Sequence, residues 1–334
     1  METLGQFALF LAETVTLVAA IVVIILLIFG LAEKNKREPG RLEIKKLNDK
    51  YQLYKSLLSA TTLPKAQAKK RHKLDKKSAK QQAKKVDDHY KRLFILEFTG
   101  DLRASDVQSL REEITAVLTA AGADDEVLVK VESPGGMVHA YGLAASQLAR
   151  IRQAGIRLTV AVDKVAASGG YLMACVADRI IAAPFAIVGS IGVIAQVPNF
   201  HRLLQKHDID FEMITAGEYK RTLTMFGENT DKARQKFKHD MEDIHLLFKE
   251  FIGKYRDTVE LEKVATGEHW PAIRAVDLNL VDTIQTSDDY LADKAKDHGL
   301  FEISYEYRQP LSAKVSGFLQ KLSDRIIFHA NTST

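Results

Sequence analysis

Short apolar runs alternate with amphipathic stretches along the chain from residue 92 onward. Residues 104–121 and 138–153 have apolar positions at helical spacing, and the runs around them have the length of strands. Strands that alternate with helices of this length are typical of βαβ crossovers and of a largely parallel sheet that is covered on both faces. The pattern therefore predicts an α/β domain over residues 92–300. Its first predicted strands are 92–100, 126–133 and 157–162.

The alternation continues beyond residue 162 with more glycine. Residues 180–197 are almost continuously apolar, but Pro184, Gly189 and Gly192 divide them into strand-length pieces. Lipid could not satisfy the backbone groups of such a broken segment, so we expect these residues in the core of the α/β domain. The later predicted elements are a helix at 198–207, a strand at 210–216, a helix at 231–256 and a short helix at 271–279 that ends with Asn279 in the left-handed conformation.

The N-terminus has a different pattern. The nineteen residues from Thr14 to Ala32 carry no charge, and at about 1.5 Å per residue such a helix crosses the roughly 30 Å of a bilayer core. A cleaved signal peptide would need a basic region first, but only Glu2 and Glu13 precede the run. A buried core helix is the other alternative. We expect an uncleaved membrane anchor over residues 1–33.

The composition of residues 34–91 predicts a basic, Lys-rich helical spacer. Residues 42–58 have apolar positions at helical spacing, and the stretch 65–85 contains ten Lys or Arg residues and one acid. A solvated spacer and a segment attracted to anionic lipid headgroups both fit this composition. At the other end, apolar residues at helical spacing over 309–329 predict an amphipathic helix within a C-terminal segment 301–334. This helix would pack on protein or lie on the membrane.

Overall composition narrows the function classes. Apolar residues make up 46% and charged residues 27% of the 334 residues, as in a folded protein. The net charge of +4 comes from the one basic stretch, so the rest of the chain is net negative and no nucleic-acid partner is predicted. The single cysteine, Cys175, allows no intrachain disulfide. The chain has no HExxH motif and no P-loop, so neither a metal nor a cofactor is expected.

Two glycine-containing segments indicate acyl-transfer chemistry. Ser168 lies in AASGGY (166–171), where a predicted strand leads into a helix. Glycine there lets a substrate backbone approach closely, and free N–H groups favour a developing oxyanion. The segment Ser133–Gly136 (SPGG) follows another strand, at the carboxyl edge where open α/β sheets bind ligands. Either segment alone is also typical of an ordinary turn.

A base for this chemistry is offered by Lys220, in GEYKR (217–221) after the predicted strand at 210–216. Taken alone, this lysine reads as a solvated surface charge. A lysine acts as a base at neutral pH only where burial or neighbouring cations lower its pKa. No histidine lies in these three segments, so a Ser–His–Asp triad is not predicted.

Four segments in a fixed order carry a family resemblance over about residues 90–300. They are ESPGG (132–136), VAASGGYLMA (165–174), VGSIGV (188–193) and GEYKRTLTMFGE (217–228). They resemble the motifs of the signal peptide peptidase A, or protease IV, family of serine peptidases. The N-terminal anchor and the Lys-rich spacer resemble its SohB-like branch.

The resemblance implies a Clp-protease/crotonase-like α/β spiral of ββα units. It further implies that Ser168 is the nucleophile, that Lys220 is its general base and that Ser190 hydrogen-bonds the lysine. Backbone N–H groups of Gly136 and Gly169 would form the oxyanion hole. Single-domain members form rings in which the serine of one copy meets the lysine of the next. We therefore expect a homo-oligomeric ring, with Ser168 and Lys220 far apart within one chain.

The expected function is that of a membrane-anchored serine endopeptidase with a Ser–Lys dyad. Its substrates would be peptides or proteins, such as signal-peptide remnants or membrane-protein fragments, at a bacterial inner membrane with anionic lipid. The basic residues after the anchor favour a cytoplasmic body by the positive-inside rule. Members of the resembled family work on the outer face, and we expect this periplasmic face. The alternatives are a crotonase-type acyl-CoA enzyme and a catalytically silent membrane scaffold.

Overall fold

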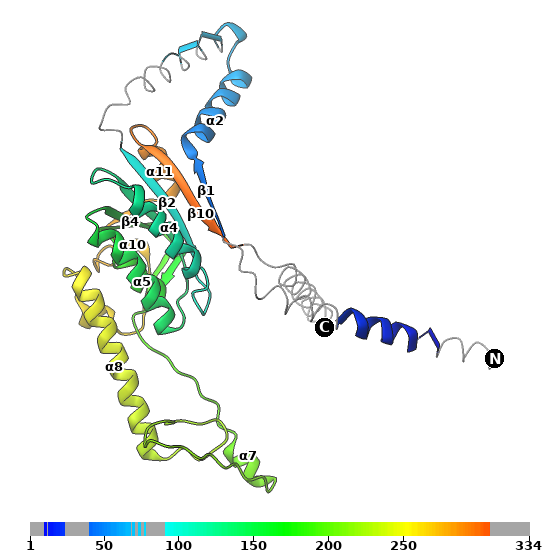
Figure 1. Cartoon of the computed structure of the whole chain (residues 1–334). Helices are drawn as coiled ribbons and strands as arrows, with labels where there is room; N and C mark the ends of the chain where they lie inside the picture. The colour runs from blue at the N-terminus through cyan, green and yellow to red at the C-terminus, as the bar shows by residue number, and fades with distance from the viewer. Residues whose placement is uncertain are drawn as a thin grey trace. The chain divides into compact units, whose positions relative to one another are not determined.

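The computed structural model describes residues 10–11, 13–23, 40–67, 69–70, 73–74, 77 and 91–307 (Figure 1). They belong to two units, one formed by residues 43–304 and the other by residues 1–42 and 305–334. In the smaller unit, residues 10–11 and 13–23 are helical. Among the described residues, no helix combines the length and the apolar character that a membrane crossing requires. The predicted C-terminal helix at 309–329 and most of the predicted anchor lie outside the described residues.

The larger unit is built on a mainly parallel sheet. Its order is β1-β10-β2-β3-β4-β6-β9, and the neighbouring strands from β10 to β9 are all parallel. The strands are β1 (Arg41–Lys46), β2 (Arg92–Thr99), β3 (Glu126–Glu132), β4 (Arg157–Val162), β6 (Arg179–Ala182), β9 (Thr283–Ile284) and β10 (Gly299–Glu306). The central strands are almost entirely buried, as expected for a parallel sheet covered on both faces.

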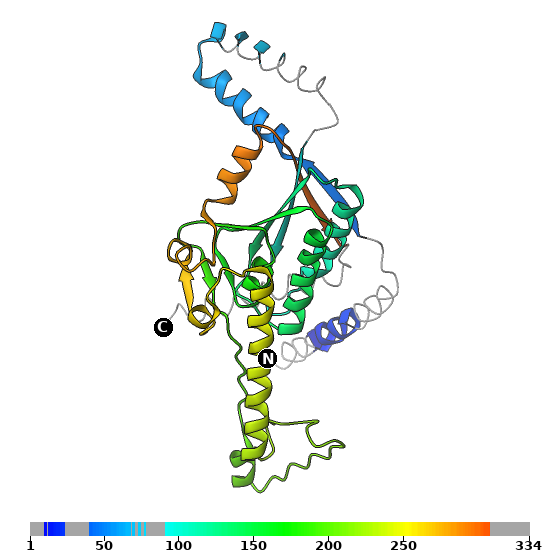
Figure 2. The ribbon, with the colours of Figure 1, turned by 90° about the vertical axis from the view of Figure 1, so that its left-hand side faces the viewer.

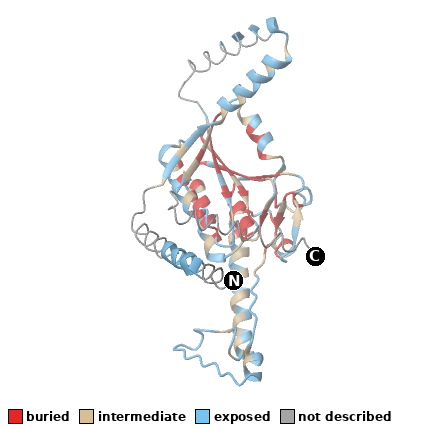
Figure 3. Ribbon diagram, turned by 90° about the vertical axis from the view of Figure 1, so that its right-hand side faces the viewer, coloured by how far each residue is buried: buried red, intermediate tan, exposed pale blue. Residues whose placement is uncertain are grey.

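Alternate side chains of the strands enter two separate hydrophobic clusters. Phe94, Leu96 and Phe98 of β2 belong to the larger cluster, whereas Leu93 and Ile95 belong to the smaller one. The larger cluster contains residues of α4 (Val107–Ala120), α5 (Val138–Gln153) and α6 (Gly169–Ala174). The smaller cluster involves α11 (Ser287–Lys294) and the first turn of α2 (Leu47–Thr62). Figure 3 shows the buried residues concentrated in these layers.

A second, three-stranded sheet has the order β5-β7-β8. Strands β5 (Val165–Ala167) and β7 (Ile187–Gly189) are parallel, and β8 (His269–Pro271) is antiparallel to β7. Each of β5 and β7 comes a few residues after a strand of the large sheet, β4 and β6 respectively. The short helices α9 (Leu261–Val264) and α10 (Ala272–Ala275) flank β8 in the chain.

The arm, which we define as residues 194–255, has a different character. It contains α7 (His201–Lys206) and the long helix α8 (Asp231–Tyr255), whose first turn is capped by the Thr230 hydroxyl, which accepts a hydrogen bond from the Ala233 N–H. Figures 1 and 2 show α8 extending away from the sheets. No residue from 194 to 251 is buried.

Several predicted elements are confirmed and two are wrong. The helices predicted at 104–121, 138–153 and 231–256 match α4, α5 and α8, and Asn279 has a φ of 58°. The strand predicted at 210–216 is absent, because these residues are exposed coil and pair with no other strand. The helix predicted from residue 42 begins only at Leu47, since residues 41–46 form β1 at the edge of the sheet. Strand β10 continues to Glu306, beyond the predicted domain end at 300.

Candidate active site

The predicted serine residues come together at the carboxyl ends of neighbouring strands. Ser133 follows β3 and forms an isolated parallel bridge with Ala166 of β5. Ala167 of β5 pairs with Gly189 of β7, and the next residues along these two strands are Ser168 and Ser190. The Ser168 N–H donates to the Gly189 carbonyl at 2.8 Å. The small sheet therefore holds the three segments side by side.

Ser168 has a strained backbone at the start of α6. Its φ of 51° and ψ of −117° lie outside the regions that residues with a side chain normally adopt. Such conformations cost about 1–3 kcal/mol and persist where the surroundings impose them, often at functional sites. Here the Ser168 N–H is bonded to Gly189 and its carbonyl accepts the Leu172 N–H at 2.9 Å. The strand-to-helix turn thus fixes the position of the Ser168 side chain.

Glycine is required around Ser168 because the backbones approach so closely. A Cβ added to Gly135, which has a φ of 94°, would lie 2.7 Å from the Ser168 Cβ and 2.8 Å from the Gly169 nitrogen. A Cβ on Gly170 would lie 2.6 Å from the Ser133 carbonyl oxygen. Among the described residues, neither the Gly136 N–H nor the Gly169 N–H has a hydrogen-bond acceptor. The arrangement therefore leaves two backbone donors free beside Ser168.

An apolar cavity of about 200 Å³ opens beside these residues. Gly136, Ser168 and Gly169 all line it, together with Val138 and Leu172. These residues belong to the body, which we define as the described residues of the larger unit outside the arm. One wall comes from α8 and consists of Ile244, Leu247, Phe248 and Phe251. These α8 residues were not predicted from the sequence as part of the site. Their spacing of three and four residues indicates one apolar face of a helix, and this was the signal for a buried contact. The cavity offers an apolar side chain a place next to the serine hydroxyl.

Ser190 lies beside Ser168 on the neighbouring strand. Its φ of 52° is again unusual for a residue with a side chain, and its N–H donates to the Glu268 carbonyl at 2.6 Å. The Gly267 N–H in turn donates to the Ile191 carbonyl at 3.1 Å. Bonding on both sides thus holds the partly exposed Ser190 close to the nucleophile candidate.

Lys220 lies elsewhere in the structure, exposed on the arm. The residues before it contact the first turns of α8: Glu218 forms an ion pair with Lys232 at 2.6 Å, and Lys236 lies 5.5 Å from the centre of the Tyr219 ring. The cavity wall begins at Ile244 and ends at Phe251. At 1.5 Å per helical residue, these lie about 12–22 Å further along α8 than Lys236. One chain therefore does not bring Lys220 to Ser168.

The single cysteine offers no competing nucleophile. Cys175 is completely buried at the end of α6. Burial raises the pKa of the Cys175 thiol far above its ordinary value, so the thiol stays protonated. Among the described residues, no group of three His, Cys, Asp or Glu side chains is arranged to hold a metal ion.

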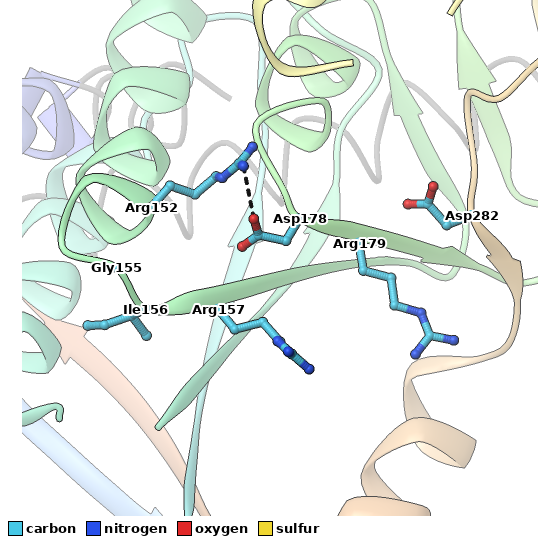
Figure 4. A pocket seen from close by; sticks show the side chains of 7 residues that line it. All are labelled: Arg152, Gly155, Ile156, Arg157, Asp178, Arg179 and Asp282. Atoms are coloured by element: carbon cyan, nitrogen blue, oxygen red, sulfur yellow. Dashed lines mark ion pairs between the residues drawn. The ribbon is translucent and has the colours of Figure 1, made fainter. Parts of the chain in front are cut away.

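A larger hollow of about 630 Å³ lies at the opposite ends of the strands, where β4 and β6 begin (Figure 4). Arg152 and Asp178 form an ion pair across it at 2.9 Å. Asp282, also in its lining, is held by Arg256 at 2.8 Å. The hollow contains none of the predicted site residues. Its paired charges belong to the framework of the fold.

Sequence comparisons show the family to which the chain belongs. The model of peptidase family S49 matches residues 150–300, and that of its N-terminal region matches residues 2–148. A probable protease SohB from Haemophilus influenzae is 45% identical over 99% of this chain and 97% of its own length. Another from Buchnera aphidicola subsp. Acyrthosiphon pisum is 45% identical over 99% of both chains. A putative signal peptide peptidase SppA from Enterococcus faecium is 28% identical over 58% of this chain and 57% of its own.

A solved mutant of a membrane-bound stomatin-specific protease aligns with a TM-score of 0.41 and 13% identity, over 61% of this chain and 84% of that chain. The protein is a mixed α/β peptidase. This class follows from the two sheets, the strained serine and the family match together. The chain belongs to peptidase family S49, and its similarity to SohB proteases over the whole length places it in the SohB-like branch.

Proposed function

We propose that this peptidase is a serine endopeptidase whose nucleophile is Ser168. The observation that carries the proposal is the strained serine at the start of α6, beside two free backbone N–H groups and an apolar cavity. In the proposed reaction, Ser168 Oγ attacks a peptide carbonyl while the Gly136 and Gly169 N–H groups bind the oxyanion. An apolar side chain of the substrate occupies the cavity. The assignment to a peptidase family favours this chemistry over that of an acyl-CoA enzyme.

The proposed general base is Lys220 of a neighbouring copy. It takes the Ser168 proton during attack and returns a proton to the leaving amine, and water then hydrolyses the acyl-enzyme by the same route. The separation of Lys220 from Ser168 along α8 supports a site shared between copies. The arm also exposes many large apolar side chains, among them Ile194, Leu203, Ile209 and Ile214. Contact with a second copy in a ring would cover them.

Ser190 has a positioning role in the proposal. Its hydroxyl oxygen accepts one hydrogen bond from the incoming lysine, which leaves the lone pair of the amine free for the Ser168 proton and holds the amine near Ser168. The adjacency of Ser168 and Ser190 across the β5–β7 pair supports this role. The order of strands supports a spiral of ββα units, because β4 and β5 precede α6 and a further strand of the large sheet, β6, precedes β7.

Membrane attachment forms the third part of the proposal. The uncharged run Thr14–Ala32 anchors the chain in the inner membrane, and the basic spacer lies against anionic headgroups. Helix α2 exposes both Lys50 and Lys55 and the apolar Leu53 and Leu57, which suits such a surface. The catalytic domain then works on the periplasmic face on signal-peptide remnants or membrane-protein fragments.

Hydrolysis of an unstructured protein such as casein by the purified full-length chain tests the catalytic proposal. We expect cleavage by the wild type and at least about a thousandfold lower kcat for Ser168→Ala. A fluorophosphonate should label the wild type and Ser190→Ala, but not Ser168→Ala. Turnover or labelling of Ser168→Ala at the wild-type level would assign the reaction to another residue.

A further inference from the structure

A chain of three hydrogen bonds lies beneath the glycine segment that precedes α5. The Gly135 N–H donates to Ser133 Oγ at 3.0 Å, Ser133 Oγ lies 2.6 Å from the Tyr141 hydroxyl, and that hydroxyl donates to the Asp101 carbonyl at 2.7 Å. A backbone N–H only donates and a carbonyl only accepts, so the Ser133 hydroxyl must donate to Tyr141. Ser133 and Tyr141 are both completely buried. The hydroxyl groups of Ser133 and Tyr141 thus each donate one hydrogen bond and accept one.

The ring of Tyr141 also touches both glycine residues that carry the free N–H groups. A Cβ added to Gly136 would lie 2.8 Å from Tyr141 Cε2, and a Cβ added to Gly169 would lie 2.4 Å from Tyr141 Cγ. Gly136 comes from the segment after β3 and Gly169 from the start of α6. The same buried ring therefore supports two separate segments of the backbone, and its hydroxyl fixes the ring in place.

At its far end the glycine segment is held by the Met137 N–H, which donates to the Leu102 carbonyl at 2.9 Å, and the bond from the Gly135 N–H to Ser133 adds a second fixed point before Gly136. Gly135 has a φ of 94°. Glycine adopts positive and negative φ about equally readily, so its own preference does not fix the backbone here. Donors that stabilise an oxyanion act strongly only when they are aimed before the reaction begins, within about 0.5 Å of the productive geometry. A hydrogen bond from the Gly135 N–H to a fixed hydroxyl restricts the peptide that leads to the Gly136 N–H.

We propose that Ser133 and Tyr141 are positioning residues that aim the Gly136 N–H, together with the Gly169 N–H, at the oxyanion formed during attack by Ser168. The inference rests on the proposed function. Neither side chain touches the substrate's reacting atoms; both act through the two glycine residues. Loss of either hydroxyl weakens the binding of the tetrahedral state more than the binding of the ground state.

Tyr141→Phe and Ser133→Ala in the full-length chain test this proposal. Tyr141→Phe keeps the ring under both glycine residues and removes only the hydroxyl. We expect kcat to fall by about 10-fold or more in each variant with KM nearly unchanged, because removal of one oxyanion donor typically costs 100- to 1,000-fold and misalignment costs less. The double variant should be no worse than the more severe single one, since both substitutions interrupt one chain.

A peptide boronic acid supplies a readout that a loss of stability would not move. Its boron bonds to Ser168 Oγ as the serine proton passes to the base, and the adduct places an oxygen at the oxyanion position. We expect its affinity to fall by the same factor as kcat, while the affinity for a peptide cleavage product, which forms no tetrahedral adduct, stays the same. Tyr290→Phe is the matched control, because Tyr290 is a buried residue of the smaller cluster and its hydroxyl contacts Thr159 and Glu126. It should lose stability but keep its kcat.

The outcomes separate this inference from the proposed function. Wild-type kcat in both Tyr141→Phe and Ser133→Ala, with Ser168→Ala inactive, would overturn the positioning role and leave the nucleophile intact. The positioning role would also be overturned if kcat fell equally in Tyr141→Phe and in the control Tyr290→Phe. A rise in KM at constant kcat would overturn it as well. A wild type without hydrolysis, or an active Ser168→Ala, would instead refute the proposed function. If Tyr141→Phe does not fold, Ser133→Ala alone decides the outcome.

Discussion

The body and the arm of the larger unit use their apolar residues in opposite ways. In the body, the large side chains of β2, β3 and β4 are buried in two clusters on the two faces of the sheet. In the arm, residues 194–251 include none that is buried, and Ile214 is 95% exposed. Apolar side chains left in water are unfavourable in proportion to their exposed area. The proposed ring would account for this difference, because one chain completes the body and a second copy would cover the arm.

The largest expected effect is on assembly, from a charge placed on the arm. Ile214→Asp should leave the unfolding of the body unchanged, because the side chain touches little in one chain. In the proposed ring it should raise the concentration needed for assembly by about 30-fold or more, with a parallel loss of peptidase activity. Sedimentation and casein cleavage measure both.

Phe185 provides the control for this substitution, because it is 85% exposed and precedes β7 outside the arm. Phe185→Asp should leave assembly and activity unchanged. A fully assembled and active Ile214→Asp protein would remove the arm from the proposed interface.

A truncation in the body should have the reverse profile. Leu128 in the central strand β3 is completely buried, and Leu128→Ala should lower the free energy of unfolding by about 2–5 kcal/mol. Denaturant unfolding measures this loss, and the protein that remains folded should assemble and cleave normally. If the variant instead lost assembly at full stability, the division into a complete body and an incomplete arm would be wrong.

Ser190→Ala tests the proposed contact between Ser190 in the body of one copy and Lys220 on the arm of its neighbour. The loss of one hydrogen bond to the incoming lysine should cost about 1–3 kcal/mol, or roughly 5- to 150-fold in kcat. Ser146→Ala is the control, because the Ser146 hydroxyl only bonds the Gly142 carbonyl on the exposed side of α5. Equal kcat values for the two variants would end the positioning role of Ser190.

The smallest expected effect concerns acid stability of the body. Burial disfavours the charged form of Glu126, but the hydrogen bond and charge of Lys294, with His298 and Arg157, outweigh it and lower the pKa of Glu126. A lowered folded-state pKa means that the ionised carboxylate contributes stability above the usual glutamate value of 4.5 and loses it as the pH falls through the folded-state value.

Unfolding of Glu126→Gln should therefore depend less on pH below about 4.5 than that of the wild type. The exposed Glu97, which pairs with Lys130, provides the control Glu97→Gln. Identical acid profiles for the wild type and Glu126→Gln would show that this pair does not stabilise the body.

The same two regions explain what could be predicted from the sequence. The body was predictable because its apolar periodicity reflects burial within the same chain, and α4, α5 and the strands β2 to β4 begin and end near the expected residues. In the arm, the apolar residues of 210–216 favoured a strand, but no strand within the described part of the chain pairs with them. The α8 wall of the cavity and the Ser133–Tyr141 contact depend on segments meeting in space, which periodicity does not reveal.

The central claim is that Ser168 and Lys220 form one site between two copies. Its most direct test mixes inactive Ser168→Ala protein with inactive Lys220→Ala protein under conditions in which native mass spectrometry shows exchange of copies. An equal mixture should regain up to about one quarter of the wild-type activity, because that share of random neighbouring pairs contains an intact serine and an intact lysine. A mixture that stays inactive despite proven exchange, or an isolated single copy that cleaves peptides, would contradict the account.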